Sequence, residues 1–152
     1  MTFADVGAGT GFFAREASTI VGPKGRVLAV EMSAAMIDQM NAIGVPTNMQ
    51  IIQSTEYSIP VDDSSADLTW ISFVTHETSD VPLFVRDAAR ITKEGGKIVI
   101  VDWKKQDEER GPAKEERLSQ EELKKRLMKF KILEEGSLNP SHYYFVIEVR
   151  KP

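Results

Sequence analysis

The sequence predicts an α/β fold: a mostly parallel seven-stranded sheet with helices on both faces and a C-terminal antiparallel hairpin. Two observations support this prediction. Up to residue 103, short apolar runs alternate with segments of helical periodicity, which is the pattern of successive β-α units. After that, strand-like segments at 130–135 and 143–151 lie too close together for the crossover that parallel neighbours need, so they must pair as an antiparallel hairpin.

The elements can be placed in order along the chain. The predicted strands are residues 2–6, 26–31, 49–53, 66–73, 97–103, 130–135 and 143–151, and the predicted helices span 10–21, 34–43, 81–92 and 119–129. The strand at 26–31 is apolar on both faces, as a buried parallel strand requires. A Gly-Gly turn at 95–96 is expected to lead into the fifth strand. Ligands of such sheets bind outside the carboxyl ends of the strands, so functional residues should follow each strand.

Most helix boundaries carry recognisable signals. Ser, Asp and Thr side chains can accept hydrogen bonds from the free amides of a first helical turn, and glycine or proline stops a helix. The signals are Gly22-Pro23 after the first helix, Ser33 and Gly44 at the ends of the second, Asp80 before the third, and the capping box Ser119-x-x-Glu122 at the fourth.

Composition limits the class of protein. The 152 residues suffice for one domain over 1–152, and 41% are hydrophobic, as in an ordinary globular protein. No run could span a membrane and no signal peptide is recognisable, so we expect a cytoplasmic protein. The absence of cysteine excludes disulfides, thiolate metal sites and a cysteine nucleophile.

The charge balance indicates which partners to expect. The net charge is −4, which argues against a nucleic-acid partner because such partners need clustered Lys and Arg. The charged stretch 104–129 mixes both signs, and we expect it to form a solvated loop and helix face.

The glycine-rich turn after the first strand predicts a nucleotide-type pocket. One interpretation takes Gly9, Gly11 and Ala14 as a nicotinamide-dinucleotide fingerprint, but it buries Asp5 in the strand at a high cost in free energy. The other takes Asp5, Gly7, Gly9 and Gly11 as one motif, with the Asp5 carboxylate exposed in the pocket. An exposed carboxylate repels pyrophosphate and attracts a cation, which favours S-adenosylmethionine (SAM), a ligand with ammonium and sulfonium groups and no phosphate.

These residues, and several later ones, resemble the class I SAM-dependent methyltransferases, a Rossmann-like family. Residues 5–11 are similar to its motif I, and Glu31 is similar to the acidic residue that binds both ribose hydroxyls in this family. A carboxylate can accept a hydrogen bond from each of the two hydroxyls. Met32 follows Glu31, at the position where the family has an apolar side chain that contacts adenine. Further similar stretches are 54–60, 66–68, the turn at 90–96 and the reversed last strand.

The resemblance implies a set of cofactor-binding residues and no metal. They are Asp5, Gly7, Ala8, Gly9, Gly11, Glu31, Met32, Ser54, Thr55, Glu56, Ser72 and Phe73. Ser54 departs from the Asp that usually contacts the adenine amino group, so adenine is expected to rely on the backbone of Thr55 and Glu56 and on Met32.

The expected reaction is methyl transfer from SAM to a small-molecule acceptor, leaving S-adenosylhomocysteine. Residues 98–103 and 116–119 look most like the ubiquinone/menaquinone-biosynthesis-type branch of the family. Positioning supplies much of the rate in such a reaction and a general base is optional. His76, just past the fourth strand, is the candidate catalytic base, although a loop histidine without a role fits equally. Asp102, at the predicted pocket rim, either binds substrate or caps a loop.

Two further hypotheses stay open: a non-catalytic SAM-binding or assembly subunit of the same fold, and a nicotinamide-dependent oxidoreductase. The family usually has a helix before motif I, and here the sequence starts inside the first strand. The expected pocket is therefore open, unless a second copy of the chain covers it in a homodimer.

Overall fold

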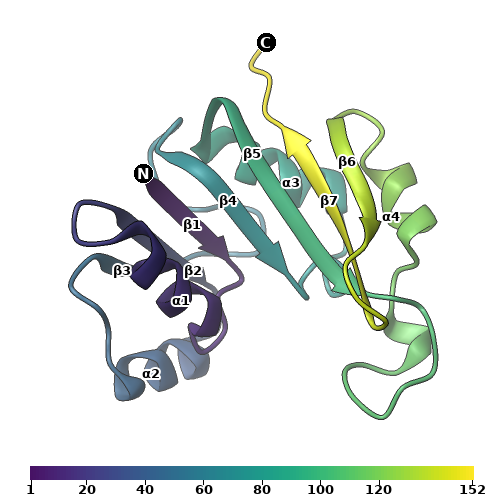
Figure 1. Cartoon of the computed structure of the whole chain (residues 1–152), viewed down its shortest axis with the longest axis horizontal. Helices are drawn as coiled ribbons and strands as arrows, with labels where there is room; N and C mark the ends of the chain where they lie inside the picture. The colour runs from purple at the N-terminus through teal and green to yellow at the C-terminus, as the bar shows by residue number, and fades with distance from the viewer.

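The computed structural model describes residues 1–152 and contains one seven-stranded sheet with helices on both faces (Figure 1). The strand order is β3-β2-β1-β4-β5-β7-β6. All neighbours are parallel except β5 with β7 and β6 with β7. The strands are β1 Thr2–Val6, β2 Arg26–Glu31, β3 Met49–Gln53, β4 Ala66–Ser72, β5 Thr92–Trp103, β6 Lys131–Ser137 and β7 His142–Glu148. The predicted fold class is confirmed.

Of the four helices, the second to fourth begin directly after their predicted capping residues, and the first begins at Phe12, two residues later than predicted. They are α1 Phe12–Val21, α2 Ala34–Ile43, α3 Val81–Ile91 and α4 Gln120–Arg126, with a short 3-10 helix η1 at Lys114–Glu116. Ser33 and Asp80 each accept a hydrogen bond from the first turn of the helix that follows, and both bonds of the Ser119–Glu122 capping box are present. None of these helices has the length and apolar character needed to cross a membrane.

Two hydrophobic cores lie on the two sides of the sheet. The larger has 20 buried residues and packs α3 and α4 against β1, β2, β4, β5 and β7. The smaller has six and packs α1 and α2 against β2 and β3. Alternate strand residues divide between them: Leu28 and Val30 belong to the larger core, and Val27 and Ala29 to the smaller.

The largest departure from prediction is at the start of β5. The expected turn at 95–96 is wrong, because β5 already begins at Thr92 and runs through both glycines. Pairing with β4 shifts register between Ala66 and Leu68, and Gly95 takes a positive φ of 75° there. The glycines thus form an irregularity within a strand, which is the other common use of glycine in a sheet.

The charged segment after β5 is also more ordered than predicted. Arg117 is fully buried, and its guanidinium donates to three backbone carbonyls of the loop and pairs with Glu108 at 2.7 Å. It also lies 5.0 Å from the Trp103 ring centre. A solvated loop is therefore the wrong description of this part, because the loop folds around one buried cation.

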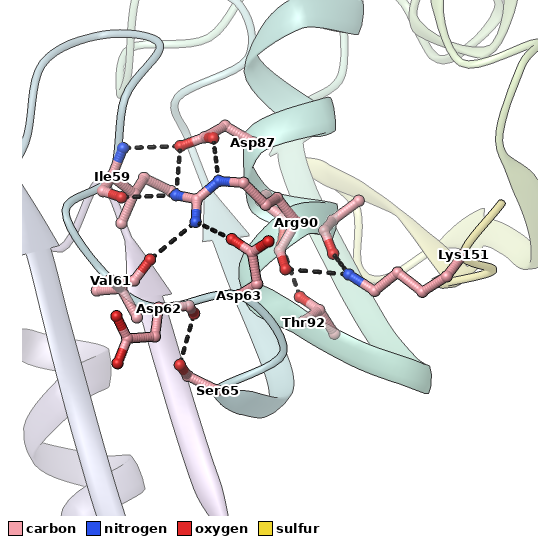
Figure 2. A network of polar contacts seen from close by, with 11 residues as sticks. Ile59, Val61, Asp62, Asp63, Ser65, Asp87, Arg90, Thr92 and Lys151 are labelled. Atoms are coloured by element: carbon pink, nitrogen blue, oxygen red, sulfur yellow. Dashed lines mark hydrogen bonds and ion pairs between the residues drawn. The ribbon is translucent and has the colours of Figure 1, made fainter.

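A second arginine fixes the loop between β3 and β4, as Figure 2 shows. Arg90 of α3 donates to the carbonyl oxygens of Ile59 and Val61, at 2.7 and 2.8 Å. It also pairs with Asp87 and Asp63, each at 2.7 Å, and these carboxylates raise its pKa. Asp87 in turn accepts from the Ile59 amide at 2.7 Å. Both polar backbone groups of Ile59 are therefore held by α3.

Candidate functional site

A cleft lies at the carboxyl ends of β1, β2, β3 and β4, where ligands of such sheets bind. Its free space, including the part open to solvent, is about 570 Å³. The lining residues are Val6, Gly7, Glu31, Met32, Ser54, Thr55, Glu56, Ile59, Val74, Glu77, Thr78 and Phe84. Six of them are predicted cofactor residues: Gly7, Glu31, Met32, Ser54, Thr55 and Glu56.

Gly7 starts the turn at the base of the cleft and cannot be replaced without strain. Its φ is +81°, and a Cβ atom at this position would lie 2.3 Å from the Cγ2 atom of Val74. The positive φ reverses the chain directly after β1, and the missing side chain lets the loop after β4 approach it closely. Sequence reasoning predicted the need for glycine here but not the contact with Val74.

Glu31 is held in the cleft by one hydrogen bond to each carboxylate oxygen. One carboxylate oxygen accepts the Gly9 amide at 2.9 Å, and the other accepts the Ser33 amide at 2.7 Å. The carboxylate thereby links the glycine turn to the start of α2. Each oxygen of an ionised carboxylate can accept a second hydrogen bond, so both remain able to receive a vicinal diol.

The amides of the glycine turn are largely satisfied by the protein itself. Those of Gly7 and Ala8 both donate to the Val30 carbonyl, at 2.8 and 2.9 Å, and that of Gly11 donates to the Ala8 carbonyl at 2.9 Å. The Gly9 amide is already held by the carboxylate at the end of β2. A pyrophosphate cradle needs free amides pointing at the ligand, so this turn is poorly suited to a dinucleotide.

The prediction that Asp5 is exposed in the cleft is wrong. Asp5 lies within β1, paired with Ala29 and Trp70, and is 1% exposed. Neither carboxylate oxygen has a hydrogen-bond partner. Burial raises the pKa of Asp5 to about 7, against a smaller lowering by the backbone amide of Ala14 in α1, which lies near the carboxylate but does not form a hydrogen bond with it. Asp5 is buried because the strand continues to Val6 and α1 covers this side chain. Charge repulsion by Asp5 therefore does not disfavour a pyrophosphate in the cleft. The hydrogen-bonded amides of the glycine turn do.

We expect Asp5→Asn to remove a large pH dependence of stability. The raised pKa means that the folded protein binds this proton more tightly than the unfolded chain, so stability is greatest at low pH and falls as the pH rises through about 7. Between about pH 5 and about pH 8 the parent should lose about 2–3 kcal/mol from this group. Urea unfolding of the parent and the variant at the two pH values measures this loss of stability. Parallel pH profiles for parent and variant would contradict the assignment.

Several predicted cofactor residues lie outside the cleft lining. Ala8 packs beside the smaller core, Gly11 is the N-cap of α1, and Ser72 is buried at the end of β4. Gly9 has a positive φ of 60° with open space where a Cβ would point. Phe73 follows β4 with φ 61°, a conformation that costs a non-glycine residue free energy and that clusters at functional sites.

The rim of the cleft joins the loops that follow β3 and β4. Glu56 accepts from the Thr78 hydroxyl at 3.0 Å and from the Ser79 amide at 3.3 Å, and these bonds lower the pKa of Glu56. The Tyr57 hydroxyl accepts from the Asp80 amide at 3.1 Å. Among the apolar lining residues, Ile59 lies in the stretch 54–60 that resembles the family, but Phe84 belongs to no motif and could not be identified from the sequence. Val74, Glu77 and Thr78 follow the end of β4, where functional residues were expected.

An aromatic band crosses the ends of β4 and β5, made of Phe13, Trp70, Phe73, Trp103 and His142. Ring-centre distances are 5.5 Å for Phe13–Trp70, 5.4 Å for Phe73–Trp103 and 4.9 Å for Phe73–His142. Phe13 and Phe73 connect its two halves at 6.4 Å. The band is therefore a continuous row of half-buried aromatic rings in contact with one another at the carboxyl ends of β4 and β5.

His76 does not line the cleft but is paired with a buried carboxylate. Its Nδ1 atom lies 2.9 Å from Asp102, which is 0% exposed. Asp102 also accepts from the Thr75 hydroxyl at 2.6 Å, the His76 amide at 3.0 Å and the Trp103 amide at 2.8 Å. The hydrogen bond to Asp102 raises the pKa of His76. Of the two roles predicted for Asp102, these bonds show the capping of a loop, because its buried carboxylate is occupied by the loop after β4 and is not exposed at a pocket rim to bind substrate.

Comparisons with known proteins agree with this geometry. Residues 4–100 match a family model described as a methyltransferase domain. Over 105 residues, 66% of the chain, the sequence is 27% identical to the ubiquinone/menaquinone biosynthesis C-methyltransferase of Hahella chejuensis and 30% identical to that of Vibrio cholerae. The matches cover 42% and 40% of those proteins, so the chain spans about two fifths of their length.

A solved structure is similar over almost the whole chain. The crystal structure of a SAM-dependent methyltransferase from Aquifex aeolicus is 28% identical and superposes with a TM-score of 0.91. The match covers 98% of this chain and 82% of that one. The similarity therefore includes the C-terminal hairpin and the segment around Arg117, which lie beyond the family match.

Proposed function

This chain belongs to the methyltransferase-domain family, and from that premise we propose that it transfers a methyl group from SAM to a small-molecule acceptor. SAM is the methyl donor named for the similar Aquifex aeolicus protein. The observation that carries the proposal for this chain is Glu31, whose two oxygens are fixed by the Gly9 and Ser33 amides at the edge of the cleft.

The cleft residues suit the parts of the donor. Glu31 would accept the two ribose hydroxyls on its remaining lone pairs. Met32, largely exposed beside it, offers an apolar contact to adenine, and the segment Ser54–Glu56 lies across the same cleft. Ile59 and Phe84 add apolar lining. The donor, when bound, supplies an electrophilic methyl group, and the protein contributes orientation of the two substrates.

The acceptor is proposed to be a flat, apolar molecule. The aromatic band borders the same edge of the sheet as the cleft and would stack against such a ring. The relatives from Hahella chejuensis and Vibrio cholerae are named for the biosynthesis of ubiquinone and menaquinone, and a quinone ring is flat. The band is the feature of this chain that supports the same class of acceptor.

Titration calorimetry tests the donor site without knowledge of the acceptor. We expect SAM and S-adenosylhomocysteine to bind with micromolar dissociation constants, and NAD not to bind at comparable concentrations. No heat with either sulfur ligand at millimolar concentration would overturn the proposal. Binding without transfer of a labelled methyl group to any hydroquinone or phenol tested would favour the non-catalytic subunit.

A further inference from the structure

A second cleft lies at the end of the sheet opposite the proposed donor site. It is lined in part by the end of β7, which is antiparallel to β5 and therefore lies near the amino ends of the parallel strands (Figure 1). Parts of α3, the connection from α4 to β6 and the tail after β7 complete the lining. Its free space, including the part open to solvent, is about 1060 Å³. No residue lines both clefts.

The lining carries mostly positive charge, although the whole chain has a net charge of −4. Of its 13 residues, six are Lys or Arg and two, Asp63 and Glu148, are acidic. We therefore call it the basic groove. Its cations are Arg86, Arg90, Lys129, Lys131, Arg150 and Lys151. Such a separation of charge attracts anions to this end of the molecule.

Two of these cations are used by the fold. Arg90 pairs with Asp63 and Asp87 and donates to two carbonyls of the loop before β4. The Lys151 ammonium donates to the carbonyls of Ala89 and Arg90, at 2.7 and 3.0 Å, where α3 ends (Figure 2). These bonds hold the C-terminal tail against α3 and so build one side of the groove. They leave neither cation free for a ligand.

The other four cations share a single carboxylate. Lys131 and Arg150 lie 3.3 and 3.1 Å from the same oxygen of Glu148. The side chains of Arg86 and Lys129 are exposed and make no hydrogen bond or ion pair. Four positive charges thus face one negative charge, and three of them are in excess.

The two unpaired cations lie on separate parts of the lining. Arg86 is on α3, and Lys129 is in the connection between α4 and β6. Arg86 is also four residues from Arg90, a spacing at which two like charges on a helix repel each other. The chemistry of the unpaired groups suits phosphate, because a guanidinium binds two phosphate oxygens at once and an ammonium adds a point charge. A phosphate group held between them would also relieve the repulsion on α3.

We propose that the basic groove binds a small ligand with two phosphate groups, held by Arg86 and Lys129. Lys131 and Arg150, which share Glu148, supply the third positive charge. Two phosphate groups carry about three to four negative charges at neutral pH, which matches this excess. Carboxylates carry one charge each, so an acidic peptide would need three of them in the same space. Binding here is independent of the proposed methyl transfer, and the donor cleft does not compete for the ligand because the amides of its glycine turn are already hydrogen-bonded.

Titration calorimetry with inorganic pyrophosphate, at about 50 mM salt, tests the groove. We expect one site with a dissociation constant of about 100 µM or lower. The affinity should stay within about twofold when S-adenosylhomocysteine saturates the donor cleft, since the two clefts share no residue. No heat at millimolar pyrophosphate would overturn the proposal, and so would displacement of pyrophosphate by S-adenosylhomocysteine. Neither result bears on methyl-donor binding, which the titration with S-adenosylhomocysteine alone measures.

The double variant Arg86→Met/Lys129→Met removes both unpaired cations and should weaken pyrophosphate binding by about 10-fold or more. Both side chains are exposed and unpartnered, so the fold should be retained. The matched control is Lys24→Met/Arg110→Met, which removes the same two charges from exposed side chains that line neither cleft. The control should bind within about twofold of the parent. Equal weakening in the two double variants would overturn the proposal, because it would show an effect of net charge alone.

Amide NMR of the parent protein locates the ligand without any variant. On addition of pyrophosphate we expect shift changes at residues 86–90, 129–131 and 147–151, with the glycine turn at 7–11 unchanged. Changes centred on the glycine turn would overturn the proposal. Hexaglutamate serves as the competitor: it should bind more weakly than pyrophosphate. Tighter binding of hexaglutamate would instead identify the groove as a docking surface for an acidic peptide and would overturn the assignment to a phosphorylated ligand.

Discussion

Glu31→Gln is expected to weaken S-adenosylhomocysteine binding by about 100-fold, or close to 3 kcal/mol, through the loss of two charge-assisted hydrogen bonds. The carboxylate accepts the Gly9 and Ser33 amides and would also accept the ribose diol. A glutamine side chain has one oxygen and one amide group, so its NH₂ would face one of the two backbone N–H groups. The substitution therefore disturbs both the diol contact and the shape of the glycine turn.

Asp38→Asn is the matched control, because it removes the same unit of charge from an exposed position in α2, outside the cleft lining. Its dissociation constant should stay within about twofold of the parent's, since an exposed charge at this distance is screened. Calorimetry on the parent and both variants separates a specific diol contact from a general charge effect. Equal affinity of Glu31→Gln and the parent would contradict the role assigned to this carboxylate.

Arg90→Met is expected to lower the free energy of unfolding by about 3 kcal/mol, because the half-buried Asp87 carboxylate loses its charged partner and the Ile59 and Val61 carbonyls lose a charged donor. Methionine keeps most of the aliphatic volume, so the effect reports lost hydrogen bonds and not a cavity. The Val61 carbonyl loses its donor (Figure 2), whereas Asp87 and the Ile59 carbonyl keep the backbone amides of Ile59 and Val61 as donors. Since Ile59 also lines the cleft, S-adenosylhomocysteine affinity should fall with stability.

Arg86→Met provides the comparison for this second prediction. Arg86 lies one turn earlier on α3 and is exposed, and its side chain makes no hydrogen bond or ion pair. Urea unfolding should therefore find it within about 0.5 kcal/mol of the parent. If the two substitutions lowered the free energy of unfolding equally, the hydrogen bonds around Arg90 would add nothing to stability beyond the effect of a positive charge on the helix surface.

Much of the fold could be predicted from local signals. The strands β2 and β3 and the helix α2 have the predicted bounds, because each is delimited by a capping residue, a glycine or a polar loop that acts within a few residues. The start of β5 could not be predicted in this way. Whether Gly95 and Gly96 form a turn or an irregularity depends on the register against β4, which is a property of two strands distant in sequence.

The same distinction between local and long-range information applies to the residues of the site. Glu31 could be identified because it ends a strand and its chemistry suits a diol. Asp5 was placed wrongly because its exposure depends on how α1 lies over β1, which no local pattern encodes. The pairing of His76 with Asp102 joins residues 26 positions apart. It arises from the register between β4 and β5, which places Ser72 opposite Val101. The residues that follow these two positions therefore lie side by side at the edge of the sheet.

A crystal structure of the protein with S-adenosylhomocysteine bound is the most direct measurement of the central claim, that this cleft is the methyl-donor site. The account predicts both ribose hydroxyls within hydrogen-bond distance of Glu31, with adenine between Met32 and the segment Ser54–Glu56. It also predicts the ligand sulfur at the end of β4, toward the aromatic band. A nucleoside bound elsewhere, or one bound in the cleft with its diol away from Glu31, would contradict it.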